Sequence, residues 1–228
     1  MIFFYIFMSK KRGYVFLDFD GTISDSKSLA YESLVSVLDD MDFRFSRFKL
    51  SKLMGVKIEK VFDFLGFDDG FFEKVKSEFY NKLVEGINLK GLKFCKDVLP
   101  LKDLKKKGVR LVIVSNSHHE FLDGSIKSLG IEDLFYEVYG SEDFDTKDKI
   151  LKKLAKRYGL NPSECFYVGD RFSDIVCARK AGFVSVAINN ECSWSTRKEI
   201  LAEKPDFIVY DFNDLREVFL RVGFLENK

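Results

Sequence analysis

The sequence contains few of the residues that build disulfide frameworks, zinc sites or rigid loops. Of its 228 residues, only 3 are proline, 2 are histidine and 4 are cysteine. The cysteines lie far apart, without CxxC spacing, at Cys95, Cys165, Cys177 and Cys192. A zinc ribbon or a dense disulfide framework is therefore not supported, and we expect buried thiols in a cytoplasmic protein.

The chain also lacks a charge excess of one sign and a long apolar run. Lys+Arg is 37 and Asp+Glu is 36, a formal net charge of +1, so no global basic surface indicates a nucleic-acid partner. No apolar run approaches the ~20 residues that cross a bilayer, so no membrane partner is expected. Residues 1–8 are apolar but lack the flanks of a signal peptide. They indicate an extra strand, a packing arm, or a segment that precedes a true start at Met8.

What the chain does contain is enough apolar material for a sizeable core. Hydrophobic residues make up 46% and charged residues 32% of the sequence, and 25 residues are phenylalanine. A chain of this length is larger than one typical domain and smaller than two. One full domain with an insertion fits that length.

Short apolar runs that end in polar residues recur along the chain. The runs cover residues 14–17, 109–114, 134–139, 165–168, 183–188 and 207–210. Helical patterns lie between several of them, for example over 147–158 and 174–181. Such alternation predicts an α/β fold with a mostly parallel, Rossmann-like sheet flanked by helices.

One segment interrupts this alternation. Between residues 24 and 92 the apolar residues recur at helical rather than strand spacing. We therefore predict a helical domain over 24–92, inserted after the first strand, and a core domain formed by 1–23 and 93–228. Thr22, just after the first strand, is a candidate cap for the start of the insertion.

Four carboxylates lie at the predicted ends of strands, where ligands bind in open parallel sheets. Asp18 and Asp20 follow the first run, and Asp170 and Asp174 follow a later one. Gathered around one point, four carboxylates would repel each other strongly. A hard divalent cation would relieve that repulsion, and ligands that offer only oxygen favour Mg²⁺ over zinc.

A carboxylate cluster that holds Mg²⁺ suits phosphoryl transfer. One carboxylate can attack phosphorus to form an aspartyl-phosphate, and a second can act as general acid and base. The phosphoryl oxygens need hydrogen-bond donors, which Ser115, Asn116 and a lysine can supply. Lys147 is suitably placed, because it begins the helical stretch before the strand that ends at Asp170.

At these residues the chain resembles the haloacid dehalogenase superfamily of phosphohydrolases. The four motifs occur in the family's order: Asp18-Phe19-Asp20-Gly21-Thr22 for DxDG[TV], the apolar strand ending at Ser115-Asn116, Lys147, and Gly169-Asp170-Arg171-Phe172-Ser173-Asp174 for GDxxxD. The resemblance covers roughly residues 14–220. The family often has Lys-Pro where this chain has Lys147-Asp148, so Lys149 is a rival for the phosphate-binding lysine.

The resemblance implies a role for each motif residue. Asp18 would be the nucleophile and Asp20 the general acid/base. Asp18, the carbonyl of Asp20, and Asp170 would hold Mg²⁺, with Asp174 as support. The inserted segment is similar to the family's small α-helical cap, and residues 53–62 look like the cap sequence of phosphoglycolate-phosphatase-like members. Gly55 and Lys57 are then the candidates for lining the closed cleft and setting substrate specificity.

The resemblance therefore implies a phosphatase that acts on a small phosphorylated metabolite, as a monomer or homodimer. Three alternatives stay open. A phosphosugar mutase of the β-phosphoglucomutase type has the same core motifs. A signalling receiver domain also phosphorylates an aspartate, although it has no inserted helical cap. A catalytically silent binding or regulatory relative would keep the fold without turnover.

Overall fold

The computed structural model describes residues 13–226. The apolar N-terminal residues 1–8 and Met8 lie outside the described residues. Within 13–226, no helix is long and apolar enough to cross a membrane.

In the described part of the chain, six strands form one parallel sheet in the order β3-β2-β1-β4-β5-β6. The strands are β1 (Tyr14–Leu17), β2 (Arg110–Val114), β3 (Glu137–Tyr139), β4 (Phe166–Gly169), β5 (Val184–Ile188) and β6 (Phe207–Val209). This is the strand order of the doubly wound Rossmann-type fold, in which the chain direction across the sheet reverses at β1. The predicted α/β class is confirmed.

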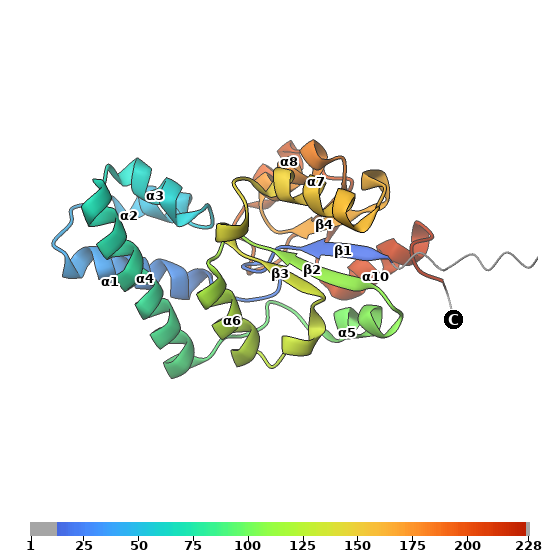
Figure 1. The fold of residues 1–228 in the computed structure, drawn as a ribbon, viewed down its shortest axis with the longest axis horizontal. Helices are drawn as coiled ribbons and strands as arrows, with labels where there is room; N and C mark the ends of the chain where they lie inside the picture. Colours follow the sequence, from blue (N-terminus) through green and yellow to red (C-terminus); the bar gives the residue numbers. More distant parts are fainter. Residues whose placement is uncertain (1–12, 227–228) are drawn as a thin grey trace, which may run out of the picture.

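Helices cover both faces of the sheet because successive strand residues point to opposite sides. On one face, Val15 and Leu17 pack with α5 (Leu99–Lys106), α6 (His119–Ser128) and α10 (Phe212–Arg221). On the other, Tyr14 and Phe16 pack with α7 (Lys147–Tyr158) and α8 (Phe172–Ala181). A further helix, α9 (Arg197–Ala202), packs through Ile200 against residues of α8 and β5. Figure 1 shows the sheet between these layers.

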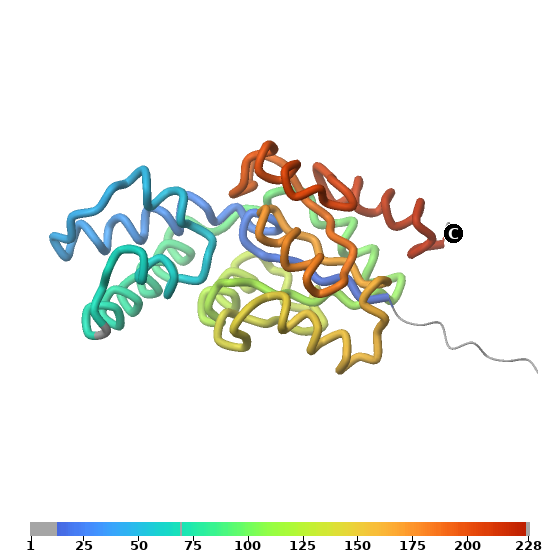
Figure 2. The backbone as a smooth tube through the Cα atoms, turned by 90° about the horizontal axis from the view of Figure 1, so that it is seen from above, coloured from blue at the N-terminus to red at the C-terminus, as the bar shows by residue number. Residues whose placement is uncertain are grey.

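A separate helical unit lies at one end of the molecule (Figures 1 and 2). It consists of α1 (Lys27–Asp40), α2 (Arg47–Leu53), α3 (Ile58–Leu65) and α4 (Asp69–Lys90). These helices bury an apolar core of their own, to which Phe121 of α6 also contributes. The expected helical cap after the first strand is therefore present.

Two segments of chain that run side by side join this cap to the sheet domain. The Asp25 amide donates to the carbonyl of Lys93 at 2.9 Å, and the Cys95 amide donates to the carbonyl of Ile23 at 2.8 Å. An isolated antiparallel bridge pairs Ser24 with Phe94 between them. The cap is thus tied to the sheet domain at the carboxyl end of β1.

Two details of the sequence-based prediction are wrong. The run 134–139 is not one strand: a 3-10 turn over Glu132–Leu134 precedes β3, which keeps only Glu137–Tyr139. Thr22 does not cap a helix, because α1 begins only at Lys27, and the Thr22 hydroxyl is buried without a hydrogen-bond partner. The intervening residues instead form the turn that connects the sheet to the cap.

Candidate active site

The candidate site lies where the strand order reverses. β1 pairs with β2 on one side and with β4 on the other. The residues that follow these three strands are Asp18, Ser115 and Asp170, and all three are buried. The carboxyl ends of three neighbouring strands therefore bring them together, although they are far apart in the sequence.

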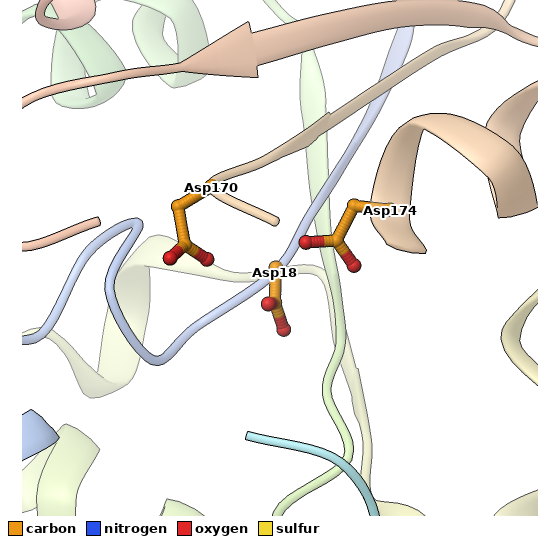
Figure 3. Close-up of side chains that lie close together, drawn as sticks. All are labelled: Asp18, Asp170 and Asp174. Carbon is orange, nitrogen blue, oxygen red and sulfur yellow. The ribbon is translucent and has the colours of Figure 1, made fainter. Parts of the chain in front are cut away.

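Three carboxylates gather at this point (Figure 3). Oxygen atoms of Asp18, Asp170 and Asp174 all lie within 4.8 Å of one another. Asp170 directly follows β4, and Asp174 lies in the first turn of α8. The expectation of four carboxylates around one point is wrong, because the side chain of Asp20 has other partners.

Asp20 is held by hydroxyl groups instead. Ser26 Oγ and Ser117 Oγ each donate to its carboxylate at 2.5 Å, and Ser115 Oγ lies at 3.4 Å. Burial raises the pKa of Asp20, although the bonds from Ser117 and Ser26 act in the opposite direction. Sequence reasoning missed Ser26 and Ser117. Ser117 lies two residues beyond Ser115 at the same strand end, which is a usable pattern, whereas nothing in the sequence marks Ser26.

Lys147 lies between two of the carboxylates. Its Nζ is 2.9 Å from Asp18 Oδ1 and 2.8 Å from Asp174 Oδ1, and the side chain is only 5% exposed. The rival Lys149 is exposed and pairs with Asp145. The structure thus brings Lys147, and not Lys149, to the carboxylate cluster.

Burial and the neighbouring charges change the pKa values of the residues in this cluster. Burial raises the pKa of Asp18 to about 7, with Lys147 opposing the shift and Asp174 adding to it. Burial, with further repulsion from Asp174 and Asp18, raises the pKa of Asp170 well above its usual range. For Lys147, burial alone would lower the pKa, but the attraction of Asp174 and Asp18 raises it above the ordinary lysine value.

The oxygen atoms without partners show where a cation fits. Asp174 is fully engaged, since Oδ1 faces Lys147 and Oδ2 accepts the Arg171 amide at 3.0 Å. Asp170 Oδ2 accepts the Trp194 amide, whereas Asp170 Oδ1 is buried with no hydrogen-bond partner. Asp18 contacts Lys147 through Oδ1 only. Unpartnered carboxylate oxygen in a buried site is the donor type that suits Mg²⁺.

A small cavity of about 60 Å³ opens onto these residues. Its walls come from the strand ends, from the cap, and from the segments after β4 and β5. They include Asp18, Asp20, Ser115, Asn116, Ser117, Met54, Gly55, Val56, Tyr80, Phe121, Arg171 and Trp194. The predicted residues Ser115 and Asn116 therefore lie beside both aspartates of the first motif.

The cap reaches the cavity through the loop between α2 and α3. The Asn116 Nδ2 group donates to the Gly55 carbonyl at 3.3 Å, and Gly55 lines the cavity. The prediction that Lys57 lines the cleft is wrong, because its side chain has partners elsewhere. Its Nζ donates to the carbonyls of Ser141, at 2.6 Å, and Phe144. Lys57 thus connects the cap to the loop after β3, rather than facing the cavity.

Comparison with known proteins agrees with this architecture. The family model for haloacid dehalogenase-like hydrolases matches residues 15–188, and the chain belongs to that family. This assignment excludes the alternative of a signalling receiver domain.

Among the curated relatives, several are phosphoglycolate phosphatases. The one from Vibrio vulnificus strain CMCP6 is 30% identical over 123 residues, which is 53% of each chain. The one from Synechococcus elongatus is 27% identical over 115 residues, which is 50% of this chain and 53% of that one. The chain therefore spans about half the length of the curated relatives it matches.

Solved structures resemble nearly the whole fold. A predicted phosphoglycolate phosphatase from Haemophilus somnus matches with a TM-score of 0.78 at 23% identity, covering 92% of this chain and 99% of that one. A hydrolase from Pseudomonas syringae matches with a TM-score of 0.79 at 17% identity, covering 93% and 99%. At such identities, these matches describe the fold, including the cap.

Proposed function

We propose that this protein is a Mg²⁺-dependent phosphatase that hydrolyses a small phosphorylated metabolite through an aspartyl-phosphate on Asp18. The observation that carries the proposal is the pairing around Asp18. Its buried carboxylate meets Lys147 at 2.9 Å and lies beside Asp170, whose Oδ1 has no partner. A nucleophilic carboxylate next to a cation and a cation-binding oxygen is the arrangement that phosphoryl transfer needs.

In the first step Asp18 attacks phosphorus, and the bond from phosphorus to the leaving oxygen breaks. Asp20 is the group that gives this oxygen a proton, because its own carboxylate is held by Ser26 and Ser117 rather than by the cation site. Water then attacks the phosphorus of the aspartyl-phosphate while Asp20 takes a proton. Inorganic phosphate leaves, and Asp18 is restored.

Three groups are proposed to bind the phosphoryl oxygens. Ser115 and Asn116 supply donors at the end of β2, and Lys147 supplies a positive charge from the start of α7. Asp174 supports the site by holding Lys147 in place. These groups need little movement during the reaction, because each is fixed to a strand or helix end.

Asp18 and Asp170, with the carbonyl of Asp20, are the proposed ligands of Mg²⁺. A bound Mg²⁺ would neutralise charge that develops on the phosphoryl oxygens. The three buried carboxylates fit this role, since within residues 13–226 Lys147 is the one cation that forms ion pairs with them. Without a cation, repulsion and burial hold the pKa values of Asp18 and Asp170 high.

The cap limits the size of the substrate. We propose a cap domain over 24–92 and a core domain over 1–23 and 93–228, with the Gly55 loop closing over the phosphoryl site. A cavity of about 60 Å³ leaves space for a small metabolite and not for a phosphoprotein. The phosphoglycolate phosphatases among the relatives support a substrate of this size.

A phosphatase screen tests the proposal directly. The purified protein, incubated with a panel of phosphorylated metabolites, should release inorganic phosphate with Mg²⁺ and not with EDTA. The Asp18→Asn variant should lose nearly all turnover, since an amide attacks phosphorus poorly. Asp123→Asn, on the exposed surface of α6, is the matched control and should keep it.

Two results would contradict the proposal. Substantial Mg²⁺-dependent turnover by Asp18→Asn would exclude Asp18 as the nucleophile. Transfer of phosphate between sugar positions, with a bisphosphate intermediate and little phosphate release, would indicate the mutase alternative.

A further inference from the structure

Arg171, inside the GDxxxD motif, is a buried cation without a partner. Its side chain lines the site cavity, and the residue is only 7% exposed. The guanidinium nitrogens Nε and Nη1 are both buried with no hydrogen-bond partner. Among residues 13–226, no acidic group forms an ion pair with it. The role proposed above for the motif uses Asp170 and Asp174 and leaves this side chain unexplained.

Such a side chain needs an anion. An arginine stays charged at any pH that the protein meets, and burying a charge without a partner is costly. Lys147, the other buried cation of the site, is already paired with Asp18 and Asp174. Arg171 forms no ion pair with Asp18, Asp170 or Asp174, although its charge attracts Asp170. Its Nε and Nη1 groups are therefore available to a ligand.

Trp194 adds a second unpaired donor to the same cavity. Its indole Nε1 is buried with no hydrogen-bond partner, while its backbone amide is used by Asp170. A methyl group at Gly21 would lie 2.4 Å from Trp194 Cδ1, and one at Gly55 would lie 2.5 Å from Cε3. The indole therefore lies between the first motif and the cap loop.

The position of Arg171 indicates which part of a substrate it meets. A methyl group at Gly55 would come within 2.5 Å of Arg171 Nη1, so the guanidinium lies directly against the cap loop. The phosphoryl group is assigned to the strand ends, at Ser115 and next to Lys147. Arg171 is thus placed on the cap side of the cavity, where the leaving group of a phosphate ester would lie.

We infer that Arg171, assisted by Trp194, binds a second anionic group of the substrate, a carboxylate carried by the leaving group. The inference rests on the proposed phosphatase function and assigns to it the residue that would select a substrate whose leaving group carries a carboxylate. A guanidinium presents parallel N–H groups that match both oxygens of a carboxylate. The cavity volume of about 60 Å³ limits the acid to a few carbon atoms.

The test compares two substrates of similar length that differ in this one group. 2-Phosphoglycolate carries a carboxylate, and 2-hydroxyethyl phosphate carries an uncharged hydroxymethyl group in its place. Wild-type protein with Mg²⁺ should prefer the carboxylate in kcat/KM. Arg171→Met should lower kcat/KM for 2-phosphoglycolate by roughly 10- to 100-fold, the usual scale for a hydrogen bond to a charged group, and leave 2-hydroxyethyl phosphate nearly unchanged.

Three further variants separate recognition from folding. Arg171→Lys keeps the charge without the paired geometry and should restore part of the preference. Trp194→Phe removes the indole N–H and should weaken the preference less than Arg171→Met. Arg179→Met, on the helix that follows Arg171 but exposed and paired with Glu203, is the control and should change kcat/KM for neither substrate. If Arg171→Met does not fold, Arg171→Lys tests the inference by itself, because it too must reduce the preference for 2-phosphoglycolate.

Equal losses on both substrates would mean that Arg171 binds the phosphoryl group, and would overturn the inference while leaving the phosphatase function in place. A wild-type protein without preference for the carboxylate would overturn it as well. If wild-type protein hydrolyses no small phosphate ester with Mg²⁺, the proposed function itself is wrong, and the inference falls with it.

Discussion

Asp18 and Asp20 are two residues apart, yet their carboxylates have different partners. Asp18 contacts Lys147, whereas Asp20 accepts hydrogen bonds from Ser26 and Ser117. The first environment suits a nucleophile next to a cation, and the second suits a group that gives and takes a proton. The two residues should therefore respond differently to the same substitution.

Asp20→Asn should lower kcat/KM for alkyl phosphates far more than for p-nitrophenyl phosphate. This parameter reports the steps up to the aspartyl-phosphate, in which an alkoxide needs a proton to leave and p-nitrophenolate does not, so the loss should approach ~10²–10⁴-fold for the alkyl ester only. Initial rates over a range of concentrations of both substrates measure kcat/KM, whereas kcat should fall for both, because the second step lacks its base. Equal losses in kcat/KM would indicate that Asp20 acts mainly by organising the cation site.

Lys147 should matter for stability as well as for activity. Lys147→Met leaves Asp18 and Asp174 without their shared cation, and breaking a buried pair in this way costs about 3–5 kcal/mol. Urea unfolding at pH 8 should show a decrease of that order. Lys149→Met, which removes an exposed pair with Asp145, should change the free energy of unfolding by less than about 1 kcal/mol. Similar decreases for both variants would contradict the assignment of Lys147.

At the scale of elements, the important contact is that between the cap loop and the sheet domain. Gly55 has a φ of +85°, and any side chain there would meet Arg171 and Trp194. Glycine is therefore required at this position for two separate reasons, backbone conformation and space.

Gly55→Ala should prevent the loop from seating against the strand ends. The strain of about 1–3 kcal/mol arises in the closed form, so kcat/KM for a small metabolite should fall by roughly tenfold or more. Gly66→Ala is a matched control, since Gly66 has a φ of +76° but nothing within 4 Å of the added methyl group. It should cost some cap stability and leave kcat/KM nearly unchanged. Equal kinetic effects would show that the contact with Arg171 and Trp194 is unimportant.

Sequence patterns predicted the elements well wherever the interactions are local. Apolar runs marked the strands, and Asp18, Ser115 and Asp170 follow directly from where those runs end. Contacts between distant segments could not be predicted in this way. Trp194 reaches Asp170 from the loop after β5, and the side chain of Lys57 turns to the carbonyl of Ser141. Neither contact produces a periodic pattern in the sequence, because each depends on how loops pack in three dimensions.

For the whole molecule, the buried carboxylates couple stability to pH and to Mg²⁺. Burial raises the pKa of Asp18 to about 7 in the folded chain, against about 3.9 for a free aspartate, and raises the pKa of Asp170 well above its usual range. Between about pH 4 and 7 the unfolded chain therefore binds fewer protons than the folded one. In this window the free energy of unfolding falls as pH rises, in the absence of a divalent cation.

Mg²⁺ should reverse this loss of stability, because it binds the ionised carboxylates. At a hundredfold excess over Kd it should raise Tm by about 5–10 °C at pH 8 and by much less at pH 5. Asp170→Asn should raise the Tm of the metal-free protein at pH 8 and remove the response to Mg²⁺. Differential scanning calorimetry measures both. An equal Mg²⁺ effect at the two pH values would show that these carboxylates are not the binding site.

The central claim is that phosphate passes through Asp18. Asp20→Asn with p-nitrophenyl phosphate and Mg²⁺ tests it most directly, since the first step needs no proton and the second lacks its base. The account predicts a burst of one p-nitrophenolate per protein, and mass spectrometry after acid quench should find the phosphoryl group on the peptide that contains Asp18. Continued turnover without a burst, or a phosphoryl group on any other residue, would contradict it.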